Sequence, residues 1–204
     1  MALTVKSIVD GRNDLGNKYV PDFNDLKRLV EVLKEAGYTI VLTQGVYDMF
    51  HVGHGRYLKD AAAFGDILIV GIDSDELTRE MKGDDRPFDE FDERIELLSM
   101  LWFVRIITRR DVGQHMHDLI KLVRPDVLVM SKTTKSFTEE DKEILKEYCG
   151  RIEHLEPKAP PERVSTTAKI LRLHREGAKA FFERLKGAFD REFDSFFEGG
   201  DSNA

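Results

Sequence analysis

The feature that most constrains this chain is an alternation of short apolar runs with segments of helical periodicity. The apolar runs lie at 38–43, 67–70, 104–108, 127–130 and 152–155. Strands that alternate with helices are joined by right-handed crossovers, which place the strands in one parallel sheet. The sequence therefore predicts an α/β fold, with a doubly wound, five-stranded parallel sheet. The last run alternates apolar and polar residues, which is typical of an edge strand.

Apolar residues spaced three and four apart predict the helices between these strands. The predicted helices cover 23–36, 53–64, 74–82, 91–102, 112–123 and 139–148. Ser74 or Asp73 is the expected cap of the third helix, because both side chains can accept a hydrogen bond from a helix N-terminus. Ligands of such folds bind at the carboxyl ends of the strands.

Three parts are predicted along the 204 residues. Residues 1–22 are rich in turn formers and are expected to be a loop. Residues 23–175 form the α/β domain, and 176–204 form a C-terminal helical extension and tail. In that extension one helical stripe carries Phe182, Leu185, Phe189, Phe193 and Phe196. Such a stripe is rarely left in water, so we expect it to pack or to form a homodimer.

The composition limits the partners. The net charge is −7 and the isoelectric point is near 5.5, so bulk binding to nucleic acid or to an anionic membrane is not expected. No apolar run approaches the roughly 20 residues that span a bilayer. The single cysteine, Cys149, cannot form an internal disulfide, which is typical of the reducing cytoplasm. A local cationic pocket for a small anion remains compatible with this charge.

The most informative motif is 44–54, Gln-Gly-Val-Tyr-Asp-Met-Phe-His-Val-Gly-His. It follows the first predicted strand and opens a helix. Gly45 permits a tight turn, and Gly53 lets a ligand approach the backbone. His51 and His54 are three residues apart, so both can face one point in the first helical turn. Capping or surface histidines would give the same spacing, but the strand, glycines and helix start together favour a phosphate site.

Further motifs follow in order. They are Lys82-Gly83-Asp84-Asp85-Arg86-Pro87, Glu93-Arg94, Arg124-Pro125-Asp126 and Val164-Ser165-Thr166-Thr167. With 44–54, they make residues 38–173 resemble the cytidylyltransferase-like nucleotidyltransferases, which share a His-x-Gly-His signature and a Rossmann-like fold. The Lys-Gly-x-x-Arg-Pro form is most similar to the heptose-phosphate adenylyltransferase branch, and the glycerol-phosphate cytidylyltransferases are the other similar branch.

The resemblance implies that a phosphorylated small molecule attacks the α-phosphorus of a nucleoside triphosphate and that pyrophosphate leaves. It implies catalytic roles for His51, His54 and Lys82, with Lys82 on a mobile loop over 81–87. The residues expected to bind the nucleotide are Gln44, Gly45, Val46, Tyr47, Gly53, Ser165, Thr166 and Thr167. Those expected at the acceptor or at phosphates are Asp48, Arg86, Arg94, Lys132 and Arg163. Mg²⁺ is expected to accompany the triphosphate, whose charge it offsets, without a dedicated metal cluster in the protein. His115 and His117 are expected to be surface residues.

Two departures from the motifs of these branches leave the nucleotide and the acceptor phosphate undecided. The sequence at 131–136 is Ser-Lys-Thr-Thr-Lys-Ser, where the heptose branch has a Gly-Gly-Asp loop. Pro160-Pro161-Glu162-Arg163 stands where cytidylyltransferases have Arg-Thr-x-Gly. Transfer of AMP from ATP to a sugar phosphate is favoured. The alternatives are transfer of CMP from CTP to a polyol or amino-alcohol phosphate, and a nucleotide-sensing module without turnover. Class I aminoacyl-tRNA synthetases share the histidine signature, but the chain is too short and too acidic for them.

Overall fold

The computed structural model describes residues 5–10, 15–132, 138–156 and 166–198. The chain divides into two compact units, Met1–Ala159 and Pro160–Ala204. The sequence placed the boundary of the α/β domain at residue 175, whereas this division falls earlier. Among the described helices, none has the length and apolar character needed to cross a lipid bilayer.

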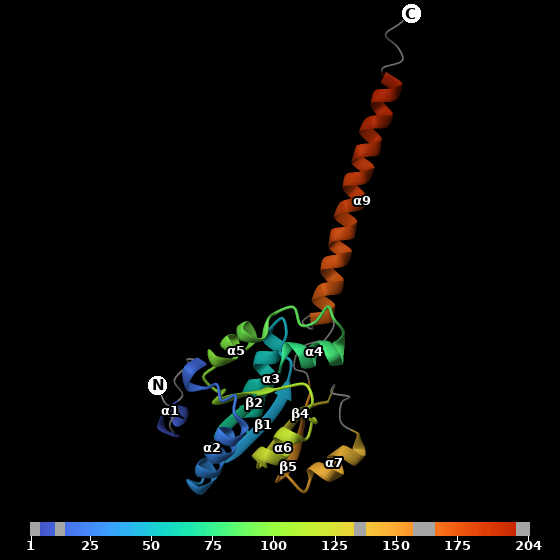
Figure 1. Cartoon of the computed structure of the whole chain (residues 1–204). Helices are drawn as coiled ribbons and strands as arrows, with labels where there is room; N and C mark the ends of the chain where they lie inside the picture. Colours follow the sequence, from blue (N-terminus) through green and yellow to red (C-terminus); the bar gives the residue numbers. More distant parts are fainter. Residues whose placement is uncertain (1–4, 11–14, 133–137, 157–165, 199–204) are drawn as a thin grey trace, which may run out of the picture. The chain divides into compact units, whose positions relative to one another are not determined.

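A five-stranded parallel sheet forms the centre of the first unit (Figure 1). Its strands are β1 (Ile40–Gly45), β2 (Ile67–Asp73), β3 (Ile106–Arg110), β4 (Val127–Ser131) and β5 (Arg151–Leu155). Their order is β3-β2-β1-β4-β5, and every neighbouring pair is parallel. The predicted α/β class and the edge position of the last strand are confirmed. The order changes direction at β1, so its carboxyl end lies at the switch point where such sheets bind ligands.

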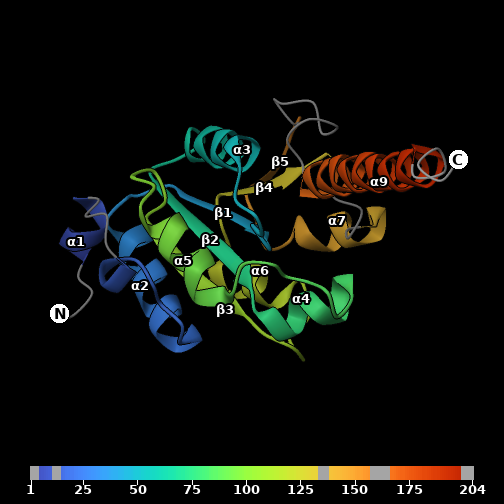
Figure 2. The same ribbon diagram turned by 90° about the horizontal axis from the view of Figure 1, so that it is seen from above.

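Helices cover both faces of this sheet (Figure 2). The helices of the first unit are α1 (Val5–Val9), α2 (Phe23–Glu35), α3 (Val52–Ala62), α4 (Asp75–Lys82), α5 (Phe91–Ser99), α6 (Asp118–Val123) and α7 (Glu139–Leu145), with a 3-10 turn η1 (Leu15–Asn17). Alternate strand residues divide between two cores: Ile40 and Leu42 pack with α2 and α6, while Val41 packs with α3 and α5. This division follows from the two-residue period of a strand.

Local capping explains where two of these helices begin. Ser74 caps α4, because its hydroxyl accepts a hydrogen bond from the amide of Leu77 at 3.1 Å. Asp22 caps α2 by accepting from the amides of Asn24 and Asp25. Ser74 is one of the two caps that the sequence proposed, and it follows directly after β2. The cap therefore starts α4 at the same sheet edge as the strand ends.

The predicted helix over 112–123 is shorter than expected, because 112–117 is a loop. Gly113 has a φ of +83°, which is outside the helical region. The amide of Asp111 donates to the side chain of Gln114, and the amide of His115 donates to Asp118, so these turns replace helical hydrogen bonds. Only Asp118–Val123 remains helical.

The described part of the N-terminal segment is more ordered than the predicted loop. It holds α1 and η1, and its residues 18–20 lie along the outer edge of β3. The amide of Val20 donates to the carbonyl of Ile107 at 2.8 Å, and the amide of Ile107 donates to that of Lys18. Lys18 is buried and its ammonium donates to the carbonyl of Leu101. This segment therefore covers an edge that would otherwise expose unpaired backbone groups.

The second unit contains the helix α9 (Thr166–Glu198). It is continuous through residue 175, so the predicted last helix of the α/β domain and the predicted C-terminal extension are one helix. Residues 157–165 lie outside the described residues.

Candidate functional site

The loop after β1 has an unusual backbone. Tyr47 and Met49 have φ values of +55° and +47°, which non-glycine residues rarely adopt. The ring of Tyr47 lies over Gly45, where a Cβ would meet its Cε2 atom at 3.2 Å. A side chain at position 45 would crowd the ring of Tyr47. Such strain in a loop at the switch point is often kept for function.

His51 and His54 lie next to each other at the start of α3. Their rings are stacked with centroids 3.9 Å apart and planes 19° apart. The rings of Tyr47 and Phe50 contact His54 with centroids at 5.6 and 5.5 Å. The two rings lie side by side, as their spacing of three residues predicts. The aromatic neighbours restrict the orientation of His54.

The N-terminal cap of α3 determines which ring nitrogen of neutral His51 carries the proton. Its Nδ1 accepts a hydrogen bond from the amide of Gly53 at 3.1 Å. A nitrogen that accepts a hydrogen bond carries no proton, so the neutral ring holds its proton on Nε2. His51 is therefore set up as a donor through Nε2, in addition to capping the helix.

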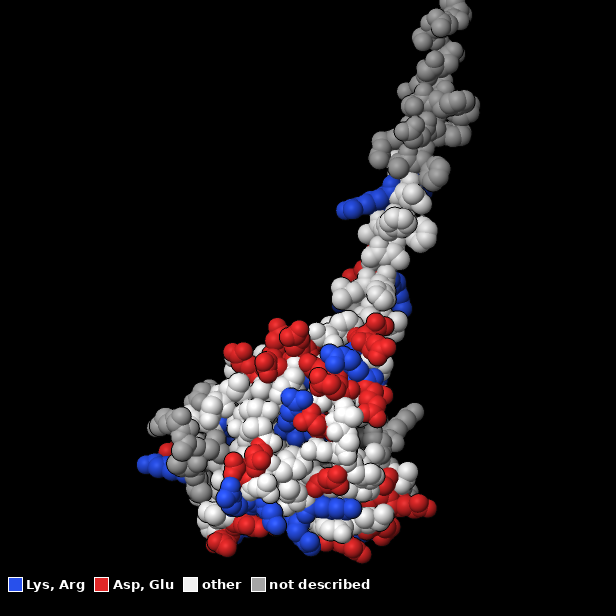
Figure 3. Space-filling model, in the orientation of Figure 1, with Lys and Arg blue, Asp and Glu red and all other residues white. Residues whose placement is uncertain are grey.

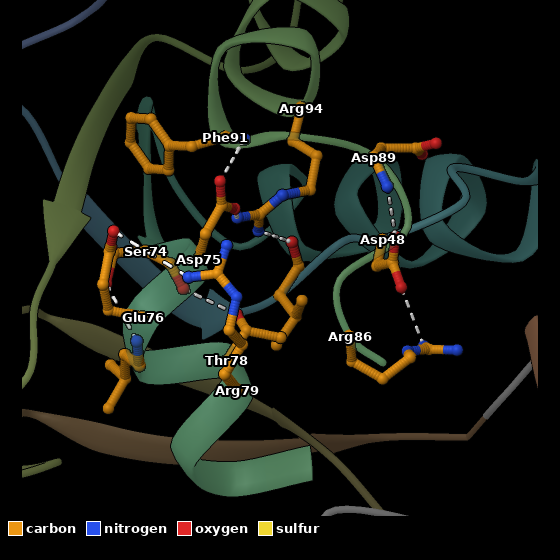
Figure 4. Close-up of polar contacts among 12 residues, drawn as sticks. Asp48, Ser74, Asp75, Glu76, Thr78, Arg79, Arg86, Asp89, Phe91 and Arg94 are labelled. Carbon is orange, nitrogen blue, oxygen red and sulfur yellow. Dashed lines mark hydrogen bonds and ion pairs between the residues drawn. The ribbon is translucent and has the colours of Figure 1, made fainter. Parts of the chain in front are cut away.

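Asp48 connects the loop after β1 to the segment before α5 (Figure 4). It is buried, and its Oδ1 accepts from the amides of Phe88 and Asp89 at 2.9 and 3.0 Å. Its Oδ2 lies 2.9 Å from a terminal nitrogen of Arg86. Asp48 was expected near the acceptor. The structure shows that it anchors residues 86–89.

Lys82 is the last residue of α4 rather than a residue of a mobile loop. Lys82 is an exposed residue, but partial burial of its ammonium group lowers its pKa, and the nearby charge of Arg86 lowers it further. Asp73 and Asp48 act in the opposite direction. These four side chains therefore form one cluster of charges at the carboxyl ends of β1 and β2. The free part of the predicted loop is short, because α4 holds one end and Asp48 the other.

Arg94 lies elsewhere than the sequence predicted. It is 1% exposed, and its two terminal nitrogens donate to the carbonyl of Val46 and to Asp75, both at 2.6 Å. Asp75 also accepts from the amide of Phe91 at 3.2 Å (Figure 4). A guanidinium held in this way is not presented to a phosphate. Arg94 instead fixes the loop after β1 against the N-terminus of α4.

Sequence reasoning missed a buried ion pair at the same sheet edge. Asp73 and Arg110 are opposite each other in the register of β2 and β3, and their side chains are 2.9 Å apart. Burial raises the pKa of Asp73, and Arg110 is the main opposing influence. Asp75 was missed as well. Both aspartates lie at or just after the end of an apolar strand, which is only a weak sequence signal for a functional role. The pairing of Asp73 with Arg110 depends on the register of β2 and β3.

The prediction of two surface histidines at 115 and 117 is wrong for His117. His117 is 3% exposed, and its Nε2 lies 3.1 Å from Asp141 at the start of α7. Burial lowers its pKa, although the carboxylate of Asp141 acts to raise it. The side chain of Gln44 reaches toward the same loop, with a long contact of 3.4 Å to the carbonyl of Met116. The contact of Gln44 ties the carboxyl end of β1 to this loop, and that of His117 ties the loop to α7.

The remaining predicted site residues lie on different elements of the two units, and two of them lie outside the described residues. Val46 belongs to the loop after β1 and Gly53 to the first turn of α3. Lys132 follows β4, is exposed and pairs with Glu156 at 2.5 Å. Thr166 and Thr167 begin α9 in the second unit. Arg163 and Ser165 lie outside the described residues.

Acidic and basic side chains are interspersed on the face of the first unit that Figure 3 shows. Basic side chains form a short row along the lower edge of that face, with acidic side chains on either side of it (Figure 3). This distribution agrees with the acidic net charge of −7. A nucleic-acid interface would require Lys and Arg to gather on one surface.

Comparison with known proteins places these motifs in a family. A model of cytidylyltransferase-like domains matches residues 42–172. The chain is 35% identical over 158 residues to the bifunctional protein HldE of a Nitratiruptor species, covering 76% of this chain and 32% of that protein. It is 43% identical over 104 residues to the HldE of Campylobacter curvus, covering 50% of this chain and 22% of that one. The chain thus spans at most about a third of these relatives.

A solved structure shares the fold. It is the lipopolysaccharide core biosynthesis protein of Thermoplasma volcanium GSS1, with a TM-score of 0.53 and 26% identity. The match covers 60% of this chain and all of that one. Pantoate-beta-alanine ligase of Francisella tularensis, at 12% identity and a TM-score of 0.50, shares the fold alone. Since the family model matches more than half of the chain and includes the stacked histidines, the protein belongs to the cytidylyltransferase-like family of nucleotidyltransferases.

Proposed function

We propose that the protein transfers a nucleoside monophosphate, preferably AMP, from a nucleoside triphosphate to a sugar phosphate and releases pyrophosphate. The observation that carries this proposal is the stacked pair His51 and His54 at the start of α3, together with the charges of Lys82, Arg86 and Asp48. These groups supply hydrogen-bond donors and positive charge at the edge of the sheet where ligands bind.

The chemistry requires positioning and charge stabilisation more than covalent catalysis. A phosphate oxygen of the acceptor forms a bond to the α-phosphorus, and the bond from that phosphorus to the pyrophosphate oxygen breaks. His51, through Nε2, and His54 donate hydrogen bonds to the oxygens on which negative charge develops. The electron pair of the broken bond leaves with pyrophosphate, so no proton needs to be removed from an acceptor phosphate that is already ionised.

Lys82 and Arg86 offset the charge where donor and acceptor phosphates meet. The lowered pKa of Lys82 reflects burial and the neighbouring arginine, so an incoming phosphate would relieve a repulsion that exists within the free protein. Arg86 is positioned by Asp48 and stacks on Phe88, with its guanidinium carbon 4.9 Å from the ring centroid. Asp48 thus holds the arginine, and α4 holds the lysine.

We propose that Mg²⁺ accompanies the triphosphate and is bound by its oxygens. Among the described residues no group of three His, Cys, Asp or Glu side chains is arranged to hold a metal. The buried carboxylates of this edge, Asp48 and Asp73, are each paired with an arginine. These residues therefore fit an ion that the substrate carries and provide no carboxylate cage of their own.

The preference for a sugar phosphate and ATP is supported by the Lys-Gly-x-x-Arg-Pro sequence at 82–87 and by the similarity to HldE proteins. By the family resemblance, Ser165, Thr166 and Thr167 would bind the β- and γ-phosphates, and Lys132 and Arg163 would contact phosphates. Transfer of CMP to a polyol or amino-alcohol phosphate is the second candidate, supported by the match to cytidylyltransferase-like domains.

Pyrophosphate release from ATP, CTP, GTP and UTP, each with sugar, polyol and amino-alcohol phosphates, tests the proposal. ATP with a sugar phosphate is expected to give the largest kcat/KM. Preference for CTP with an amino-alcohol or polyol phosphate would favour the second candidate. Nucleotide binding without pyrophosphate release from any pair would contradict turnover and indicate a nucleotide sensor.

Replacing Lys82 by Ala is expected to reduce kcat by about 10²-fold, because a positive charge near the transition state is lost. Affinity for the free nucleotide, measured by calorimetry, should change much less. Lys59→Ala on the exposed side of α3 is the matched control and should leave both quantities unchanged. A Lys82→Ala protein with collapsed nucleotide affinity and an unchanged kcat at saturation would contradict this role.

Replacing Asp48 by Asn is expected to release residues 86–89, because Arg86 loses its buried counterion. Trypsin should then cut the Lys82–Gly83 bond several-fold faster at a temperature well below unfolding, and the melting temperature should fall as well, because Asp48 is buried. Asp89→Asn is the matched control, since the amide of Asp89, not its carboxylate, is bound by Asp48. Equal cleavage rates for wild type and Asp48→Asn would show that Asp48 does not anchor this segment.

A further inference from the structure

The two central strands of the sheet, β1 and β4, are paired over only a short stretch. Their register consists of two residue pairs and ends at Leu42 and Leu128, whereas β1 pairs with β2 along six residues. Residues 43–45 of β1 continue beside β2, and 129–131 of β4 continue beside β5. The central ladder therefore ends before the carboxyl edge, at the switch point where sheets of this kind bind ligands.

Tyr57 of α3 joins the two strands beyond the end of this ladder. Its hydroxyl donates to the carbonyl of Val129 on β4 at 3.1 Å, and its oxygen lies 2.8 Å from the hydroxyl oxygen of Thr43 on β1. A tyrosine hydroxyl has a single proton, so the bond between the two hydroxyls is donated by Thr43. Burial raises the pKa of Tyr57 to about 12, which keeps the hydroxyl protonated at neutral pH.

This bridge lies close to the histidine pair. Tyr57 follows His54 by three residues on α3, and residues three apart lie on one side of a helix. Tyr47, whose ring contacts that of His54 edge-on, is also near the bridge. Burial raises the pKa of Tyr47, Tyr57 raises it further, and Thr43 acts in the opposite direction. The bridge is thus connected to His54 through the helix, and it borders the tyrosine that restrains the ring of His54.

We propose that Tyr57 is a positioning residue that holds the first turn of α3, and with it His51 and His54, in a fixed place relative to the carboxyl ends of β1 and β4. This inference rests on the proposed function, because the histidines must meet the phosphates of a nucleotide bound at this edge. Hydrogen-bond donors stabilise a transition state only when they are held within about 0.5 Å of the productive geometry. Tyr57 acts through the two histidines and not by contact with the substrate.

Tyr57→Phe tests this role, because it removes the hydroxyl and keeps the ring. The kcat for pyrophosphate release should fall about tenfold, while the KM of the acceptor changes by less than about twofold. The melting temperature should fall by a few degrees, since the carbonyl of buried Val129 loses its donor. Val30→Ala in the opposite core is the matched control, because it also lowers the melting temperature and should leave kcat unchanged. A wild-type kcat in Tyr57→Phe, or an equal loss of kcat in Val30→Ala, would overturn the proposal.

Two variants of Thr43 test whether the bridge acts by joining the strands. Thr43→Ser keeps the hydroxyl that donates to Tyr57, so its kcat should stay within about twofold of the wild-type value. Thr43→Val has nearly the same shape without the hydroxyl, so its kcat should fall several-fold. In Tyr57→Phe combined with Thr43→Val the two losses should not add, because both remove the same bridge. Equal kcat values for the serine and valine variants would overturn a bridge between β1 and β4.

NMR spectra of the histidine rings test the positioning without any turnover. Since Tyr57→Phe keeps the aromatic ring and its ring current, a change in the ring signals of His51 and His54 reports a movement of the pair. Those signals should shift, and the signal of His174 on α9 should not. Unchanged signals of His51 and His54 would overturn the proposal. If the wild-type protein releases no pyrophosphate with any substrate pair, the proposed function fails, and these spectra still decide whether Tyr57 positions the histidines.

Discussion

His54→Ala is expected to lower kcat by about 10²-fold or more while the fold persists. His54 stacks on His51 and is flanked by Tyr47 and Phe50, so its ring is held in one orientation at the start of α3. Removing the ring deletes a donor to charge that develops in the transition state. Steady-state release of pyrophosphate measures kcat, and thermal unfolding measures whether the fold is retained.

The matched control for His54 is His154→Ala. His154 is an exposed histidine on the edge strand β5, away from the loop after β1. Its removal should leave kcat and the melting temperature unchanged. If His54→Ala turned over like the wild type at an unchanged melting temperature, the histidine pair would not be the catalytic centre.

Arg94→Ala is expected to destabilise the protein by about 3–5 kcal/mol, the cost of removing one partner of a buried ion pair. The substitution removes the arginine donor from the carbonyl of Val46 and from Asp75, which keeps only the amide of Phe91. Since Val46 begins the loop that positions Asp48, kcat should fall as well. Urea unfolding measures the free energy, and the midpoint should shift while the slope stays constant.

Two control experiments distinguish the contact between Arg94 and Asp75 from a general loss of stability on substitution. Arg28→Ala removes an exposed arginine from its surface pair with Asp25, and should change stability by less than about 1 kcal/mol. Asp75→Asn combined with Arg94→Ala should cost less than the two single changes added together, because both act on one contact. A purely additive result would show that Arg94 and Asp75 are not coupled.

The α/β class and the histidine pair followed from the sequence because they depend on local patterns. Strands buried on both faces leave continuous apolar runs, and a helix start brings residues three apart onto one side. The strands at 67–73 and 127–131 begin where the predicted runs begin. His51 and His54 needed no long-range information, since the whole pair lies within the first turn of one helix.

The helix predicted from residue 112 failed where local hydrogen bonds competed with periodicity. The apolar spacing of Val112, Met116 and Leu119 suits a helix, but Gly113 takes a positive φ and the side chain of Gln114 bonds to the backbone of Asp111. The burial of His117 likewise required contact with α7, which is more than 20 residues away in the chain.

The sequence alone determined the five strands and the helices between them, apart from 112–117, because those features are encoded within a few residues. The tertiary structure decided what the charged residues do. Asp48 and Arg94 are residues of types that often bind ligands. In a sequence, a charged side chain looks the same whether it contacts a phosphate or another part of the protein. Their partners are about 40 residues or more away for Asp48 with Phe88 and for Arg94 with Val46. Only the folded chain brings these groups together, and burial makes such pairs obligatory, since an isolated charge in the interior costs far more than a paired one.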